Sequence, residues 1–288
     1  MISYPIDFEG ISTRVLEAGV GNNNLLFIHG LGARADRWRQ TIEHYATRGF
    51  HCYAFDLPGH GFATKGIGPD YSIAGFARLT TGLMYRLGLD DAAIVGTSLG
   101  GHIGAQVCID QPTRIRGLAL VGAVGIAPVS DESRQAIRDS ISRTTREAIG
   151  AKLRFVLAKP DLVTEAWIQE EWRINTSAGA AASFEALGKY FYEHINRDAI
   201  VDQLLPLTCI IPMQLFWGEM DRAVPIEVGQ RAAHLLGGIP IHGIAGAGHA
   251  PYFEAPAAFD AKVLPFLESL DWSSRTHSLN GWPTDKTL

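Results

Sequence analysis

The stretch that decides the fold runs from residue 92 to residue 101 and reads AAIVGTSLGG. Four apolar residues come first, then Gly96-Thr97-Ser98-Leu99-Gly100, then a segment with helix-like spacing. A Gly-x-Ser-x-Gly turn between strand and helix needs small residues, because the sharp turn lifts the serine hydroxyl above the sheet. The alternative is a serine that caps an ordinary helix. The preceding strand and the motifs described below favour Ser98 as a nucleophile.

On both sides of this turn, short apolar runs alternate with longer amphipathic stretches. The pattern predicts strands at residues 11–17, 25–28, 52–55, 92–95, 118–121, 213–217 and 239–244. It predicts helices at residues 35–48, 72–88, 99–111, 226–236 and 256–270. Strands that alternate with helices indicate an α/β fold, with a mostly parallel sheet flanked by helices.

The alternation stops between residues 127 and 205, where apolar residues fall near helical spacing and no convincing strand occurs. We expect one core, formed by residues 1–126 and 206–270, with residues 127–205 inserted as a helical cap over Ser98. Residues 271–288 turn polar and lose periodicity, which predicts a peripheral C-terminal tail.

Composition limits the classes of function. Lys plus Arg number 25 and Asp plus Glu number 30, a net charge of −5 with no basic block, so nucleic acid is an unexpected partner. Three cysteines without CxxC spacing suggest neither a disulfide framework nor a zinc site. Free cysteines are expected in a reducing compartment such as the cytoplasm. We find no signal-peptide pattern and no run of 18 apolar residues, so no membrane span is expected.

Four further motifs follow predicted strands: His29-Gly30-Leu31-Gly32, the segment from Asp56 to Gly61, the segment from Trp217 to Asp221, and Gly248-His249. Together with the serine turn, they make residues 10–270 resemble the α/β-hydrolase fold superfamily, in particular its members with a helical cap. The resemblance implies that the cap is inserted after the sixth strand.

A serine hydroxyl is a weak nucleophile near neutral pH and needs a base, which a carboxylate orients. In this fold the chain order is nucleophile, acid, histidine, which the sequence supplies as Ser98, Asp221 and His249. Glu219 and Asp131 are rival acids. Resemblance to the family's acid loop favours Asp221.

Acyl transfer also needs donors for the developing oxyanion. The amide of Leu99 begins a helix and has no partner within it, so it can serve as one donor. The resemblance gives Leu31 as the second. His29 and His60 lie in family motifs and are expected to brace neighbouring loops. No metal and no organic cofactor is implied.

The cap is rich in aromatic residues, which suits an apolar portion of a substrate but equally suits packing within the cap. Candidate substrate contacts are Trp172, Arg173 and Trp217. Related enzymes that cleave carbon-carbon bonds of ring-fission products hold the substrate carboxylate with a cap arginine. Rough matching places Glu171 at that position, and a solvated Arg173 paired with Glu170 is the alternative.

These observations predict a serine hydrolase that cleaves a small ester, thioester or lactone, with a small-molecule carbonyl compound as its partner. One alternative is a hydrolase of carbon-carbon bonds in ring-fission products, using the same three side chains. Another, from a different class, is a small-molecule receptor that retains the triad. A homo-oligomeric state is left open.

Overall fold

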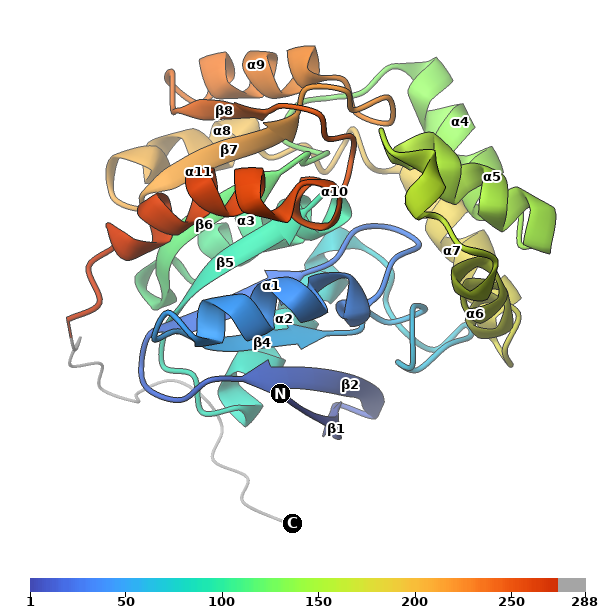
Figure 1. Cartoon of the computed structure of the whole chain (residues 1–288), viewed down its shortest axis with the longest axis horizontal. Helices are drawn as coiled ribbons and strands as arrows, with labels where there is room; N and C mark the ends of the chain where they lie inside the picture. The colour runs from blue at the N-terminus through green and yellow to red at the C-terminus, as the bar shows by residue number, and fades with distance from the viewer. Residues whose placement is uncertain (274–288) are drawn as a thin grey trace.

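The computed structural model describes residues 1–273 and contains an eight-stranded sheet flanked by helices (Figure 1). The strand order is β1-β2-β4-β3-β5-β6-β7-β8, and every strand except β2 runs in the same direction. The strands are β1 (Ile2–Phe8), β2 (Ile11–Ala18), β3 (Asn24–Ile28), β4 (His51–Phe55), β5 (Ala92–Thr97), β6 (Ile115–Val121), β7 (Met213–Gly218) and β8 (Ile241–Ile244).

Helices cover both faces of the sheet. One face packs against α1 (Arg39–Ala46) and α11 (Pro256–Glu268), and the other against α2 (Ile73–Arg86), α3 (Leu99–Asp110) and α9 (Ile226–Leu235). Short helices connect these elements: α8 (Val201–Leu204), α10 (Pro251–Glu254) and 3-10 turns at Ala35–Trp38, Pro112–Arg114, Pro160–Leu162 and Leu205–Cys209. The predicted α/β class with a mostly parallel sheet is therefore confirmed.

The sheet has a hydrophobic core on each face, because successive side chains along a strand point to opposite faces. In β3, Leu26 and Ile28 belong to the core under α2 and α3, whereas Leu25 and Phe27 belong to the core under α1 and α11. Central strands buried on both faces read as continuous apolar runs. This is why short apolar runs located these strands in the sequence.

Between β6 and β7 the chain forms four helices of the cap, which lie beyond the carboxyl ends of the parallel strands (Figure 1). They are α4 (Asp131–Ile141), α5 (Arg146–Val156), α6 (Glu165–Asn175) and α7 (Ala180–Glu193). The helical insertion after the sixth strand is confirmed. The boundaries given for core and cap, residues 1–126, 127–205 and 206–270, stay a prediction.

The two ends of the chain add to what the sequence predicts. The strand predictions began at residue 11 and did not include β1, an edge strand with mostly exposed or half-buried residues and therefore little apolar signal. Of the predicted tail, Asp271 to Ser273 are described, and Trp272 packs on the Phe50 ring at 5.8 Å. Residues 274–288 lie outside the described part of the chain.

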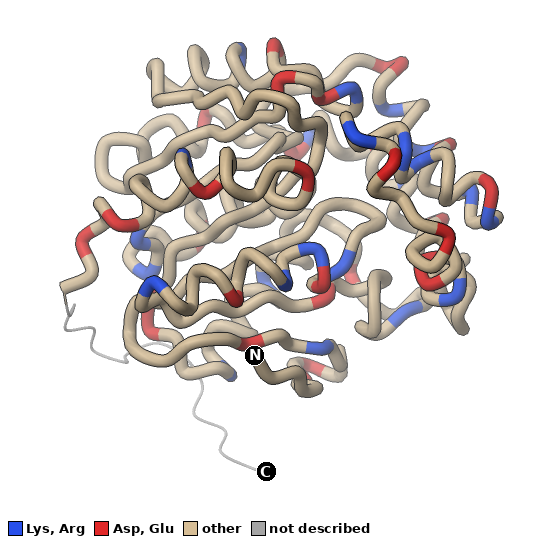
Figure 2. The backbone as a smooth tube through the Cα atoms, viewed as in Figure 1, with Lys and Arg blue, Asp and Glu red and all other residues tan. Residues whose placement is uncertain are grey.

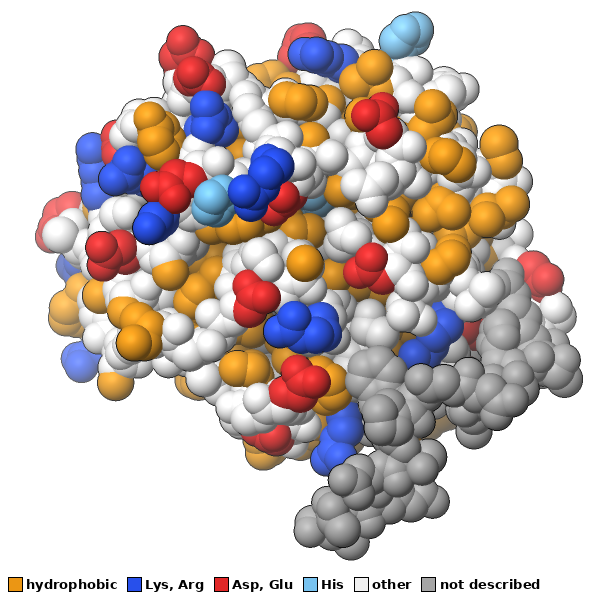
Figure 3. All heavy atoms as spheres, turned by 180° about the vertical axis from the view of Figure 1, so that it is seen from behind, with side chains coloured by type: hydrophobic (Ala, Val, Ile, Leu, Met, Phe, Trp, Pro, Cys, Tyr) orange, Lys and Arg blue, Asp and Glu red, His pale blue; other side chains and the backbone are white. Residues whose placement is uncertain are grey.

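Charged residues of both signs are interspersed over the backbone, including the cap (Figure 2). Seen from behind, the surface carries several groups of hydrophobic side chains among polar and charged ones (Figure 3). Over residues 1–273, none of the helices combines the length and the apolar character needed to cross a membrane. Self-association and a cytoplasmic location stay predictions.

The turn after β5 is built by close backbone packing. Ser98 has φ 54° and ψ −118°, in the left-handed region that costs a non-glycine residue about 1–3 kcal/mol. A Cβ on Gly96 would lie 2.3 Å from the Gly100 carbonyl oxygen, and one on Gly100 would lie 2.2 Å from the Ile28 oxygen. The glycines are thus required because strand and helix backbones meet with no space for a side chain.

We predict that Gly96→Ala destabilises the protein by about 1–3 kcal/mol or more, because its new methyl group meets immobile backbone. The free energy of unfolding in urea measures this change. Gly68→Ala is the matched control, since no atom lies within 4 Å of the added Cβ. Equal stability of the two variants would contradict the packing explanation.

Candidate active site

Three loops at the carboxyl ends of parallel strands bring together residues that are far apart in sequence. Ser98 follows β5, Asp221 follows β7 and His249 follows β8. The Nδ1 of His249 donates a hydrogen bond to Oδ2 of Asp221 at 2.7 Å. Ser98 and His249 line one cavity. The structure therefore assembles the base, its carboxylate and the hydroxyl in one region.

Asp221 is held rigidly on its loop. Its Oδ1 accepts hydrogen bonds from the amides of Ala223 and Val224, both at 2.9 Å, and its side chain is fully buried. Trp217 Nε1 donates to the Val224 carbonyl at 2.8 Å. Trp217 is itself completely buried, so it braces the acid loop and does not line the cavity.

The rival acids lie elsewhere. Asp131 begins α4 with its side chain 84% exposed and pairs with Arg134. Glu219 is exposed and makes no hydrogen bond to His249. Geometry therefore singles out Asp221 as the partner of His249 within residues 1–273.

The partner carboxylate determines the protonation of His249. Burial acts to lower the pKa of this imidazole, but the charge and hydrogen bond of Asp221 act against it and leave the pKa raised above 6.5. Other buried histidines differ: burial lowers the pKa of His29 to about 4 and that of His60 to about 3. The Asp221 carboxylate thus keeps the pKa of His249 from falling as those of the other two histidines do, which suits a side chain that takes up a proton.

The loop after β3 lies against Ser98. A Cβ on Gly30 would lie 3.0 Å from the Cβ of Ser98, so only glycine lets the loop approach this closely. His29 fixes the loop, because its Nε2 accepts from the amide of Leu57 at 2.9 Å and its Nδ1 donates to the Gly30 carbonyl at 2.8 Å. The expected bracing by His29 is what the structure shows.

The two amides expected at the oxyanion position belong to Leu31 and Leu99. Neither amide has a hydrogen-bond partner among the residues that the structure describes. Leu31 lines the cavity beside Ser98, and Leu99 begins α3 directly after it. Two free donors near the serine can stabilise negative charge on a carbonyl oxygen.

The cavity in front of Ser98 has a volume of about 100 Å³ and mostly apolar walls. Core and cap both contribute to it. Its lining residues are Gly30, Leu31, Gly32, Ala33, Arg37, Thr97, Ser98, Lys152, Leu153, Val156, Leu157, Trp167, His249, Ala250, Tyr252 and Phe253.

The three candidate substrate contacts do not line this cavity. Trp172 is half-buried within the cap, and Arg173 is exposed with its guanidinium 5.5 Å from the Trp172 ring. Arg173 is not paired with Glu170, which instead contacts Arg34 at 2.6 Å. Sequence reasoning did not single out the charged lining residues Lys152 and Arg37. The sequence does carry a signal for Lys152, because it lies three residues after Ile149 and four before Val156, on the same apolar face of α5.

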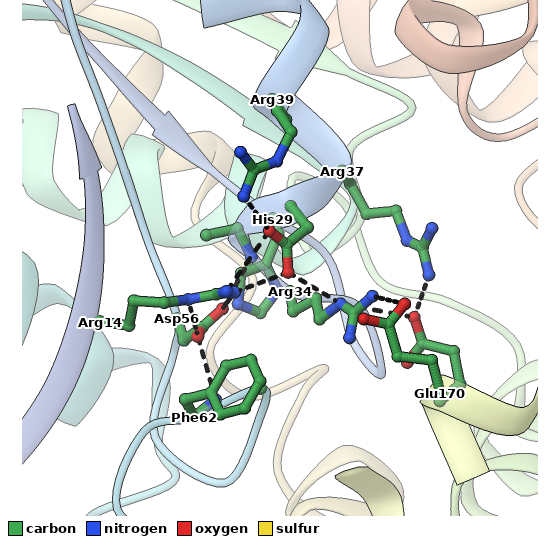
Figure 4. A network of polar contacts seen from close by, with 12 residues as sticks. Arg14, His29, Arg34, Arg37, Arg39, Asp56, Phe62 and Glu170 are labelled. Carbon is green, nitrogen blue, oxygen red and sulfur yellow. Dashed lines mark hydrogen bonds and ion pairs between the residues drawn. The ribbon is translucent and has the colours of Figure 1, made fainter. Parts of the chain in front are cut away.

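An ion network joins the cap to the core (Figure 4). Arg34 and Arg37 of the core point toward α6, where Arg34 pairs with Glu170 and Arg37 with Glu171. The Arg37 guanidinium also lies 3.9 Å from the Trp167 ring centroid. Glu171, which rough matching placed at the cap arginine of related enzymes, is thus a buried carboxylate that faces core arginines.

A second set of contacts anchors the end of α5 to the histidine loop. The buried Glu254 accepts hydrogen bonds from the amides of Gly248 at 2.9 Å and Ala158 at 2.5 Å. The amide of His249 donates to the Val156 carbonyl at 2.9 Å. The cap is therefore joined to the loop that carries His249 by a backbone hydrogen bond and by the Glu254 side chain.

Comparison with known proteins agrees with this geometry. The sequence profile of the family described as alpha/beta hydrolase fold matches residues 23–256. The chain belongs to that family. Among residues 1–273, no group of three or more His, Cys, Asp or Glu side chains is arranged to hold a metal ion.

Relatives in this family carry different names. The chain is 26% identical over 261 residues, 91% of its length and 68% of the relative's, to the dihydrolipoyllysine-residue acetyltransferase component of the acetoin cleaving system of Cupriavidus necator. It is 25% identical to a 2-hydroxy-6-oxononadienedioate/2-hydroxy-6-oxononatrienedioate hydrolase of Burkholderia vietnamiensis, over 87% of this chain and 89% of the relative.

Among solved structures, the fold is similar to 2-hydroxy-6-oxo-6-phenylhexa-2,4-dienoate hydrolase from Rhodococcus sp. strain RHA1. The TM-score is 0.83 at 20% identity, covering 93% of this chain and 99% of the other. A meta-cleavage product hydrolase from Pseudomonas fluorescens IP01 gives a TM-score of 0.81 at 23% identity, covering 92% and 97%. At these identities the likeness concerns the fold.

We predict that the pKa of His249 lies above the ordinary value for histidine and that Asp221→Asn lowers it, because burial is then opposed only by the charge of Glu254. Imidazole NMR shifts followed against pH measure both values. Glu219→Gln is the matched control: it removes a carboxylate from the same loop, and His249 should titrate unchanged. A His249 pKa unaffected by Asp221→Asn would refute the pairing.

Proposed function

We propose that the protein is a serine hydrolase that cleaves a small ester, thioester or lactone through an acyl-enzyme. The observation that carries this proposal is the 2.7 Å hydrogen bond between His249 and Asp221, with Ser98 on a strained turn at the same cavity. This combination fits nucleophilic acyl transfer, in which a base oriented by a carboxylate activates a serine hydroxyl at a cavity.

In the proposed first step, Ser98 Oγ attacks the substrate carbonyl while His249 Nε2 takes the hydroxyl proton. Asp221 fixes the Nδ1–H tautomer and stabilises the imidazolium. The amides of Leu31 and Leu99 donate to the oxyanion. Collapse expels the alcohol, thiol or ring oxygen, which receives the proton from His249.

In the second step, a water molecule attacks the acyl-enzyme, and His249 takes a proton from that water. Collapse of the second tetrahedral intermediate releases the carboxylic acid and returns the proton to Ser98 Oγ. The mostly apolar cavity walls, including Leu153, Leu157 and Phe253, favour a small substrate with an apolar portion.

A second candidate is hydrolysis of a carbon-carbon bond in a ring-fission product, with the same three side chains. Relatives from several bacteria named 2-hydroxy-6-oxononadienedioate/2-hydroxy-6-oxononatrienedioate hydrolase, which are 24–25% identical to this chain over most of their lengths, favour it. Faster turnover of such a dienedioate than of simple esters would select this candidate.

We predict that Ser98→Ala lowers kcat for 4-nitrophenyl esters by about a million-fold, because the nucleophile is lost and only binding and oxyanion stabilisation remain. Absorbance of released 4-nitrophenolate measures the rate. The control is Ser140→Ala, which changes an exposed serine of α4 and should retain full activity.

A fluorophosphonate probe provides an independent readout of the same serine. Intact-protein and peptide mass spectrometry should find one adduct, on Ser98, in the wild type and in Ser140→Ala, and none in Ser98→Ala. Ester hydrolysis that survives Ser98→Ala, or a probe attached elsewhere, would overturn the proposed mechanism.

A further inference from the structure

Lys152 is a cation at the wall of the candidate active site. It lies on α5, and its side chain lines the cavity together with Leu153 and Val156 of the same helix. Its Nζ lies near the loop after β3, 3.2 Å from the point where a Cβ on Gly32 would stand. The ammonium group is therefore close to the loop that carries the Leu31 amide.

Within residues 1–273, Lys152 forms no hydrogen bond and no ion pair within 4.0 Å. The other lysine or arginine in the lining, Arg37, is already neutralised by Glu171 and covers the Trp167 ring. No Asp or Glu stands among the lining residues. Lys152 is thus the cation whose charge the surrounding protein leaves uncompensated at the cavity.

Lys152 is half-buried, so its ammonium is partly removed from water. A charged group in this position is stabilised by a partner of opposite charge or by hydrogen-bond acceptors. Burial lowers the pKa of Lys152, and the charge of Glu171 opposes this effect without a direct contact. An anionic group placed in the cavity would supply both the charge and the acceptors that the ammonium lacks.

We propose that Lys152 binds a carboxylate of the substrate, so that the protein acts on small carbonyl compounds that carry a negative charge near the bond cleaved. This inference rests on the proposed hydrolase function and narrows its substrate class. Lys152 is then a specificity-determining residue of the cap, distinct from the candidate triad and from the two oxyanion amides.

The test compares anionic esters with neutral esters of matched size. On the acyl side, the pair is mono-4-nitrophenyl glutarate and 4-nitrophenyl pentanoate. On the alcohol side, it is 4-acetoxybenzoate and methyl 4-acetoxybenzoate. We expect the wild type to show a KM about 10- to 100-fold lower for the anionic member of at least one pair, the effect of a hydrogen bond between charged groups.

Lys152→Met should remove this preference by raising KM for the anion, with little change for the neutral ester. Lys152→Arg, which retains the charge, should keep most of the preference. Lys189→Met is the matched control, because Lys189 is an exposed cation on α7 away from the cavity. Lys152→Gln provides a second neutral variant, and thermal unfolding establishes that each variant is folded.

Three results would overturn the proposal: no anionic preference in either pair, a preference that survives Lys152→Met, or an equal loss on anionic and neutral esters. The last result would indicate that Lys152 stabilises the oxyanion or the fold. If no ester is cleaved in a Ser98-dependent way, the proposed function fails by itself. Calorimetry with glutarate then tests the anion site directly. Glutarate binding by the wild type but not by Lys152→Met supports the anion site. No binding by the wild type, or equal binding by both proteins, refutes the anion site.

Discussion

The active-site geometry depends on the contact between the backbone of β5 and the first turn of α3. The carbonyl oxygen of Gly100 occupies the space that a side chain on Gly96 would need, and Gly100 itself lies against the end of β3. This contact holds Ser98 at positive φ, where the hydroxyl stands at the cavity and the Leu99 amide is left without a partner. The strain is retained because the packed strands and helix on both sides fix the turn.

Buried carboxylates connect the cap to this rigid core. Glu171 faces Arg34 and Arg37. Glu254 accepts hydrogen bonds from backbone amides of the histidine loop and of the residues just after α5. Removing one partner from such a buried set costs more than an exposed pair contributes, so these contacts define where the cap sits. The position of α5 in turn places Lys152 and the apolar lining residues in front of Ser98.

The sequence predicted every strand except the edge strand β1, and it predicted the cap insertion, because these depend on periodicity. The serine turn pointed to Ser98, whereas resemblance to the motifs of the α/β-hydrolase fold was needed to choose Asp221 and His249. It did not predict which cap residues reach the cavity. Trp172 was a candidate, but Trp167, on the same helix, lines the cavity. Which face of a cap helix meets the core depends on long-range contacts such as those of Glu171, which no local pattern encodes.

The central claim is that Ser98 and His249 act as one unit, oriented by Asp221. The most direct test is a double-mutant cycle on kcat for a 4-nitrophenyl ester, using Ser98→Ala, His249→Ala and the double variant. Residues that act as a unit are strongly non-additive, so the double variant should be no slower than the slower single variant. Losses that multiply across the two sites would show that the residues act independently and would contradict the account.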